Sequence, residues 1–108
     1  MNKIKQTLKE LGIMPNVKGY HYLATAIEMV ANDFRKKETV YSWIGLYRII
    51  ANKHNDTSGN NVERCIRKAI YDAVEARTEL FDKLFLTNNH SNSAFIAIVA
   101  EYIVEEEK

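Results

Sequence analysis

Residues 46–76 read LYRIIANKHNDTSGNNVERCIRKAIYDAVEA, and this stretch decides the fold. It predicts a short apolar helix, a polar turn of His54, Asn55, Asp56 and Thr57, and then a second, amphipathic helix. Two helices at this spacing are typical of a helix-turn-helix, whose second helix fits the DNA major groove. We therefore expect a helix-turn-helix at about 46–76, with a recognition helix at about 60–76.

The predicted second helix has one apolar and one polar face. At about 100° per residue its apolar side chains fall on a single stripe, made of Val62, Ile66, Ala69, Ile70 and Ala73. The opposite face carries side chains that suit nucleic acid, namely Asn60, Asn61, Arg64, Arg67, Lys68 and Tyr71. Arginine can donate to guanine and asparagine can pair with adenine, whereas lysine suits a phosphate. The alternative interpretation is an ordinary solvated helix face.

Start signals mark two of the predicted helices. Asn60 is followed three residues later by Glu63, a capping-box pattern that predicts a helix start at Asn60, with Ser58 and Gly59 in the preceding turn. Near the carboxyl end, Ser91 or Ser93 is expected to cap a final helix.

The remaining apolar periodicity is also helical. It predicts a first helix through Leu11 that stops at Gly12, a longer one from about Lys18 to Phe34, a polar loop or turn at 35–42, and a short helix at 79–86. The segment 87–93, TNNHSNS, is the most loop-like of the chain. The expected fold is an all-α compact bundle of about six helices that contains the helix-turn-helix.

The charge is distributed unevenly along the chain. The formal net charge is only +1, too small to mark a general polyanion binder. Residues 1–68, however, hold 12 Lys and Arg against 6 Asp and Glu, a net of +6. Residues 69–108 hold 3 against 8, a net of −5, to which the acidic residues 105–107 contribute. This asymmetry suits a domain with one nucleic-acid face and one protein-facing side.

Length and motif content exclude several classes of protein. The 108 residues are enough for one globular domain spanning 1–108, and a single cysteine, Cys65, excludes a disulfide framework or a zinc site. His21, His54 and His90 have no metal-binding spacing, and there is no glycine-rich phosphate loop. We expect no catalytic residue, metal or cofactor, and thus no enzyme. Without an apolar run of about 18 residues or a signal peptide, a cytoplasmic protein with no membrane contact is expected.

Five segments resemble the C-terminal effector domain of a sporulation response regulator family, that of stage-zero sporulation protein A. They are LKELGIMP at 8–15, KGYHYL at 18–23, AIEMVAND at 26–33, VERCIRKAI at 62–70 and NSAFIAIVAE at 92–101. The match covers nearly the whole chain in the same order. The resemblance implies an all-helical DNA-binding domain of spore-forming Firmicutes that regulates transcription from a short promoter box.

The resemblance also implies site residues and partners. It places the DNA-contacting positions on Glu63, Arg64, Arg67 and Lys68, and it implies a homodimer on double-stranded DNA that touches a sigma factor of RNA polymerase. The chain departs from the family pattern at Asn61, where an arginine is usual, at Lys68, where a histidine is usual, and in a turn one residue longer. One lost arginine contact removes on the order of 1–3 kcal/mol of base discrimination, so we do not carry over the family's promoter sequence.

Two questions stay open at the level of sequence. The family protein carries a receiver domain whose phosphorylation controls dimerisation, and these 108 residues contain none. The chain can be a stand-alone protein or an excised domain, and its regulation differs accordingly. The alternative function is a protein-interaction module, an antagonist or partner of a full-length relative, that has kept the fold and lost specific DNA binding.

Overall fold

The computed structural model describes residues 2–38, 42–55, 58–87 and 89–108. Regular structure in these segments is entirely α-helical, in the order α1 (Asn2–Glu10), α2 (Lys18–Lys36), α3 (Trp43–Lys53), α4 (Gly59–Ala76), α5 (Glu79–Leu84) and α6 (Asn92–Glu106). The helices form a compact bundle with a radius of gyration of 12.8 Å. The expected all-α class and the number of helices are confirmed.

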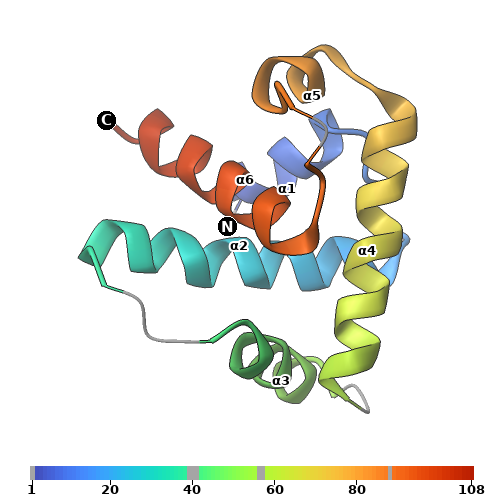
Figure 1. Cartoon of the computed structure of the whole chain (residues 1–108), viewed down its shortest axis with the longest axis vertical. Coiled ribbons are helices and arrows are strands. Elements are labelled where there is room, and N and C mark those ends of the chain that lie inside the picture. Colours follow the sequence, from blue (N-terminus) through green and yellow to red (C-terminus); the bar gives the residue numbers. More distant parts are fainter. Residues whose placement is uncertain (1, 39–41, 56–57, 88) are drawn as a thin grey trace.

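Helix α2 is the centre of the bundle. It packs against α1, α3, α4 and α6, and eleven of its 19 residues are buried, among them Tyr20, Leu23 and Ile27. Figure 1 shows α2 lying across the molecule, with α4 standing at one of its ends, α6 running over it and α3 below it. A helix buried on so much of its surface needs small side chains where others cross it, and α2 supplies Gly19 and four alanines or threonines among its buried positions.

Side-chain caps fix where four of the helices begin. Ser42, Ser58, Thr78 and Ser91 each have an extended backbone, and each side-chain oxygen accepts from the backbone N–H three residues on. Ser91 is thus the cap of α6, one of the two serines expected. The predicted start of α4 at Asn60 is wrong: the Ser58 hydroxyl accepts from the Asn61 N–H at 3.1 Å, so the helix already includes Gly59. Both residue types cap well, and the choice depends on backbone geometry.

Other helix ends differ by a few residues from the prediction. Helix α2 continues through Arg35 and Lys36 and ends where Lys37 adopts a left-handed conformation, with a φ of 58°. Helix α3 begins at Trp43 rather than Leu46, because Ser42 caps it. Helix α5 ends at Leu84, two residues early, since Phe85 leaves the helical conformation. Residues 39–41 of the predicted 35–42 loop, and Asp56 and Thr57 of the predicted turn, lie outside the described residues.

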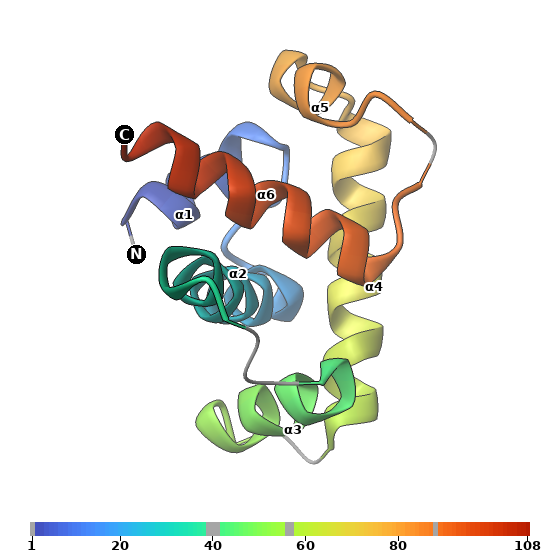
Figure 2. The ribbon, with the colours of Figure 1, turned by 60° about the vertical axis from the view of Figure 1, so that its left-hand side comes forward.

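The apolar stripe of α4 holds that helix against the bundle. All five residues predicted for the stripe are at most 3% exposed. Its contacts are with α2, α3 and α6. Figure 2 shows α4 along one edge of the molecule, with the beginning of α1 and the end of α6 on the opposite side. The polar face of α4 is therefore turned to the outside of the bundle.

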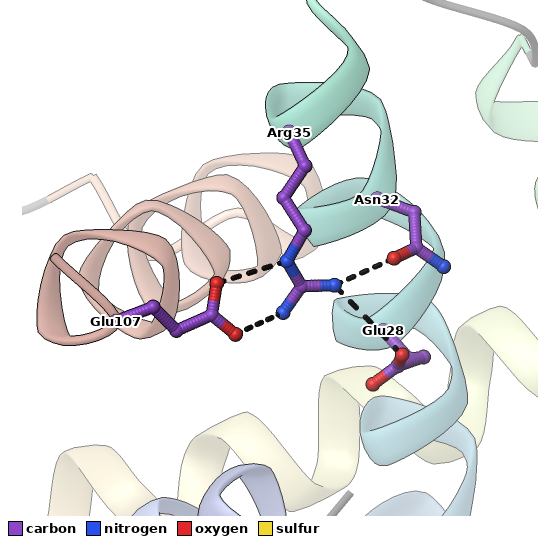
Figure 3. Close-up of polar contacts among 4 residues, drawn as sticks. All are labelled: Glu28, Asn32, Arg35 and Glu107. Atoms are coloured by element: carbon purple, nitrogen blue, oxygen red, sulfur yellow. Dashed lines mark hydrogen bonds and ion pairs between the residues drawn. The ribbon is translucent and has the colours of Figure 1, made fainter.

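The carboxyl end of α6 is tied back to α2. The Arg35 guanidinium donates from Nε and Nη2 to the two carboxylate oxygens of Glu107, at 2.9 and 2.6 Å, and from Nη1 to Asn32 Oδ1 (Figure 3). Glu28 lies 3.9 Å from the same guanidinium. Nearby, Lys3 of α1 pairs with Glu106 at 3.6 Å. Two of the acidic residues behind the uneven charge distribution thus pair with cations from the basic half of the chain.

Candidate nucleic-acid interface

The predicted DNA-contacting residues all lie in the first three turns of α4, but they differ in exposure. Asn60, Arg64, Arg67 and Lys68 are exposed, whereas Asn61 and Glu63 are half-buried. Successive residues turn by about 100°, so Arg64 projects almost opposite the buried Val62 and Ile66, with Arg67 and Lys68 on either side of it. The structure therefore gathers three cations on the outer face of one helix.

One of these cations is paired within the helix. An Arg67 guanidinium nitrogen donates to the Glu63 carboxylate one turn earlier, an i, i+4 ion pair. The Arg67 side chain is 57% exposed and that of Glu63 36%, so the pair lies at the edge of the outer face. A single exposed pair of this kind adds little to stability, but it restricts where the long arginine side chain points.

The same turn of α4 is joined to the start of α6. The Asn92 side-chain amide donates to the Glu63 backbone carbonyl at 3.0 Å, although 29 residues separate them. Tyr47 of α3 reaches the same junction. Burial raises the pKa of the Tyr47 hydroxyl above its ordinary value, and its hydrogen bond with the Asn92 side chain acts in the opposite direction. Three helices thus meet around Asn92.

A groove of about 640 Å³ opens at this junction, between α3, α4 and residues 90–93. Its walls are largely apolar and aromatic, formed by Trp43, Tyr47, Ile70, Tyr71, Val74 and His90. Glu63, Arg67 and Asn92 line it as well. The groove runs along one flank of α4, because five residues of that helix line it: Glu63, Arg67, Ile70, Tyr71 and Val74.

Sequence reasoning missed Arg48. This exposed residue of α3 lines a shallow depression of about 300 Å³ together with Ser58, Gly59 and Asn60 at the start of α4. The first helix of a helix-turn-helix crosses the DNA backbone, so a cation there is a signal for a phosphate contact. Arg48 lies within the first helix predicted from the sequence, so its charge could have indicated this phosphate contact.

Cys65 and the three histidines gather into no site within the described part of the chain. Cys65 is half-buried and packs against the core, as expected of a structural thiol. The His21 ring lies 2.9 Å from the Pro15 carbonyl oxygen and His54 lies 2.8 Å from the Thr25 hydroxyl, while His90 packs against Phe81 and Phe85.

Among the described residues, no three His, Cys, Asp or Glu side chains gather to hold a metal ion. None of the helices in that part of the chain has the length and apolar character needed to cross a bilayer.

Helices α3 and α4 are consecutive and packed together, and α4 presents a cationic outer face, as expected of a DNA-binding regulator. Comparison with known families agrees. Residues 4–103 match the family described as sporulation initiation factor Spo0A C terminal, and the chain belongs to that family. The family is a DNA-binding effector domain of a sporulation response regulator and is regulatory rather than catalytic. The family resemblance expected from the sequence is confirmed.

Proposed function

We propose that this chain, as one domain spanning 1–108, is a sequence-specific regulator of transcription that places α4 in the DNA major groove. The observation that carries the proposal is the division of α4 into two faces. One face buries five apolar residues in the bundle, and the other presents Arg64, Arg67 and Lys68 to solvent in the first three turns. Those are the turns with which a recognition helix reaches base edges.

Each of the predicted DNA-contacting residues of α4 then has a chemical role. Arg64 and Arg67 can donate two hydrogen bonds each to guanine O6 and N7, and Asn60 or Asn61 can pair with adenine. The Glu63 carboxylate can accept from a cytosine amino group and also orients Arg67, its partner in the ion pair. Lys68 lies further along the helix, where a phosphate contact fits its single charge better.

Phosphate contacts from α3 complete the interface. Arg48 lies beside Ser58 and Asn60, next to the amino end of α4. Backbone N–H groups at a helix amino end attract anions, so the corner between α3 and α4 suits one phosphate group. From the family we further infer that the protein binds double-stranded DNA as a homodimer and contacts a sigma factor of RNA polymerase.

The proposal is tested by selecting duplexes from a random library with the purified 108-residue protein, followed by sizing of the selected complex. We expect a defined duplex motif, and a complex with two protomers. Arg64→Ala and Arg67→Ala should each weaken binding to that duplex by about 1–3 kcal/mol and relax base preference at one position, whereas Lys68→Ala should weaken all duplexes similarly.

The alternative function, a protein-interaction module, predicts a different outcome of the same experiment. Half-buried Asn61 stands where the family usually has an arginine, and the net charge is only +1, which motivate this alternative. A folded protein that enriches no duplex, and that instead forms a stable complex with a full-length relative or a sigma factor, would favour it.

A further inference from the structure

We propose that Asn92 is a positioning residue for DNA reading, because its amide fixes the turn of α4 that carries Arg64 and Arg67. This inference rests on the proposed function of α4. Asn92 is the first residue of α6 and lies outside the proposed recognition helix, so the proposal gives it no contact with DNA. It acts through the backbone of Glu63, to which its side chain donates at 3.0 Å.

The carbonyl that Asn92 engages is well placed to control both arginines. In an α-helix the carbonyl of Glu63 accepts the backbone N–H of Arg67, four residues later. A carbonyl oxygen has two lone pairs, so the Asn92 amide can use the second without breaking the helix. The peptide group of this carbonyl also joins Glu63 to Arg64. One hydrogen bond from outside the helix therefore restrains the backbone at both Arg64 and Arg67.

The hydrogen bond from Asn92 to Glu63 adds a directional restraint to the packing of α4. The apolar stripe holds α4 against the bundle, but hydrophobic burial is non-directional and tolerates small rotations of a helix about its axis. A bidentate contact to guanine tolerates less, because N–H···O bonds weaken steeply as their angle departs from linear. The hydrogen bond from Asn92 of α6 to the turn of α4 at residues 63–67, the reading turn, therefore fixes the rotation of α4 about its axis. The apolar stripe alone does not fix this rotation.

The donor is itself held in place. The neighbouring Ser91 caps α6 by accepting from the Ala94 N–H at 3.3 Å, and the Ser91 N–H donates to the Asn89 side chain. The side chain of Tyr47 of α3 lines the same groove as Asn92. Helices α3, α4 and α6 thus meet around the Asn92 amide group. The position of the turn that carries Arg64 and Arg67 therefore depends on how these helices pack.

Asn92→Asp is the most direct test, with Ser93→Asp as its matched control. Aspartate has the shape of asparagine but cannot donate to the Glu63 carbonyl. The first turn of a helix favours a negative charge, so α6 should stay folded in both variants. Ser93→Asp adds the same charge one residue further on and leaves the Asn92 amide intact, so any general repulsion of DNA is common to the pair.

We expect Asn92→Asp to bind the selected duplex about tenfold more weakly than Ser93→Asp, the equivalent of one arginine-to-guanine hydrogen bond lost through misalignment. Binding to random-sequence duplex should be equal in the two variants, whereas the melting temperature of Asn92→Asp should fall by about 4–8 °C with the lost hydrogen bond. A purely structural role for Asn92 would lower the melting temperature in the same way but would not change the ratio of specific to non-specific binding.

Amide hydrogen exchange tests the anchor without DNA. Exchange at the amides of residues 62–68, and at Arg67 above all, should be faster in Asn92→Asp than in Ser93→Asp. Equal exchange in the two variants overturns the proposal, whatever the DNA result. Equal specific-to-random ratios also overturn it. If the unmodified protein selects no duplex, the proposed function fails instead, and the exchange data still decide whether Asn92 anchors α4.

Discussion

Gly19 of α2 lies directly against the backbone of Cys65 in α4, so closely that a Cβ atom at Gly19 would stand 2.3 Å from the Cys65 carbonyl oxygen. The same atom would stand 2.6 Å from the Ala69 side chain. The central helix and the candidate reading helix are therefore in backbone contact at this crossing. Because Cys65 directly follows Arg64, the crossing also sets how far the reading turn stands from the bundle.

Gly19→Ala is expected to destabilise the protein by about 1–3 kcal/mol, because the added methyl group forces α2 and α4 apart. The measurement is urea unfolding followed by circular dichroism. Gly45→Ala is the matched control within a helix, since its new methyl group would meet only the capping Ser42 side-chain oxygen, at 3.2 Å, which limits its cost to the roughly 1 kcal/mol of that cap. Equal stability of Gly19→Ala and wild type would show that the two helices do not cross this closely.

The start of α4 provides a second stability prediction. Ser58→Ala should cost about 1 kcal/mol, because it removes the acceptor for the Asn61 N–H. Asn60→Ala should cost less, since Asn60 is an exposed residue within the first turn. Thermal unfolding of the two variants distinguishes the caps. A larger loss for Asn60→Ala would restore the capping-box interpretation.

The ion pair between Arg35 and Glu107 should make stability depend on pH. The Arg35 guanidinium, which donates to both carboxylate oxygens, holds the pKa of Glu107 below its ordinary value of 4.5. A carboxylate with a lowered pKa in the folded state contributes stability above its unfolded pKa and loses it as the pH falls through the folded one. Glu107→Gln should therefore melt slightly lower than wild type at pH 7, and the difference should shrink as the pH falls below 4.5 and vanish once Glu107 is protonated in the folded protein.

A matched substitution controls for the change in net charge. Glu101→Gln removes the same charge from an exposed position of α6. Its difference from wild type should not follow the same pH profile. If Glu107→Gln and Glu101→Gln gave identical melting curves from pH 3 to 7, the Arg35 contact would have no energetic role in solution.

Arg48 is expected to contact a phosphate and no base. Arg48→Ala should weaken binding to the selected and to random duplexes by a similar factor, and it should lower the slope of log K against log salt by about one. Lys83→Ala, which removes one charge from α5, should leave that slope unchanged. A loss confined to the selected duplex would assign Arg48 to base reading instead.

Features that depend on local periodicity could be predicted from the sequence, whereas a contact between residues far apart in the chain could not. The buried stripe of α4 follows from spacing alone, and its five residues are all buried. The start of α4 was misplaced because Ser58 and Asn60 are both good cap residues, and only backbone geometry distinguishes them. The hydrogen bond between Asn92 and Glu63 spans 29 residues, and no pattern within one helix indicates it.

The central claim, that the outer face of α4 reads DNA sequence, is tested most directly by competition titrations of the selected duplex against random duplex. The proteins compared are wild type, the Arg64→Ala/Arg67→Ala variant and a Lys9→Ala/Lys83→Ala variant that loses the same charge from α1 and α5. Circular dichroism first confirms that all three are folded. We predict that only the double arginine variant loses its preference for the selected duplex, by about tenfold or more. An undiminished preference in that folded variant would contradict the account.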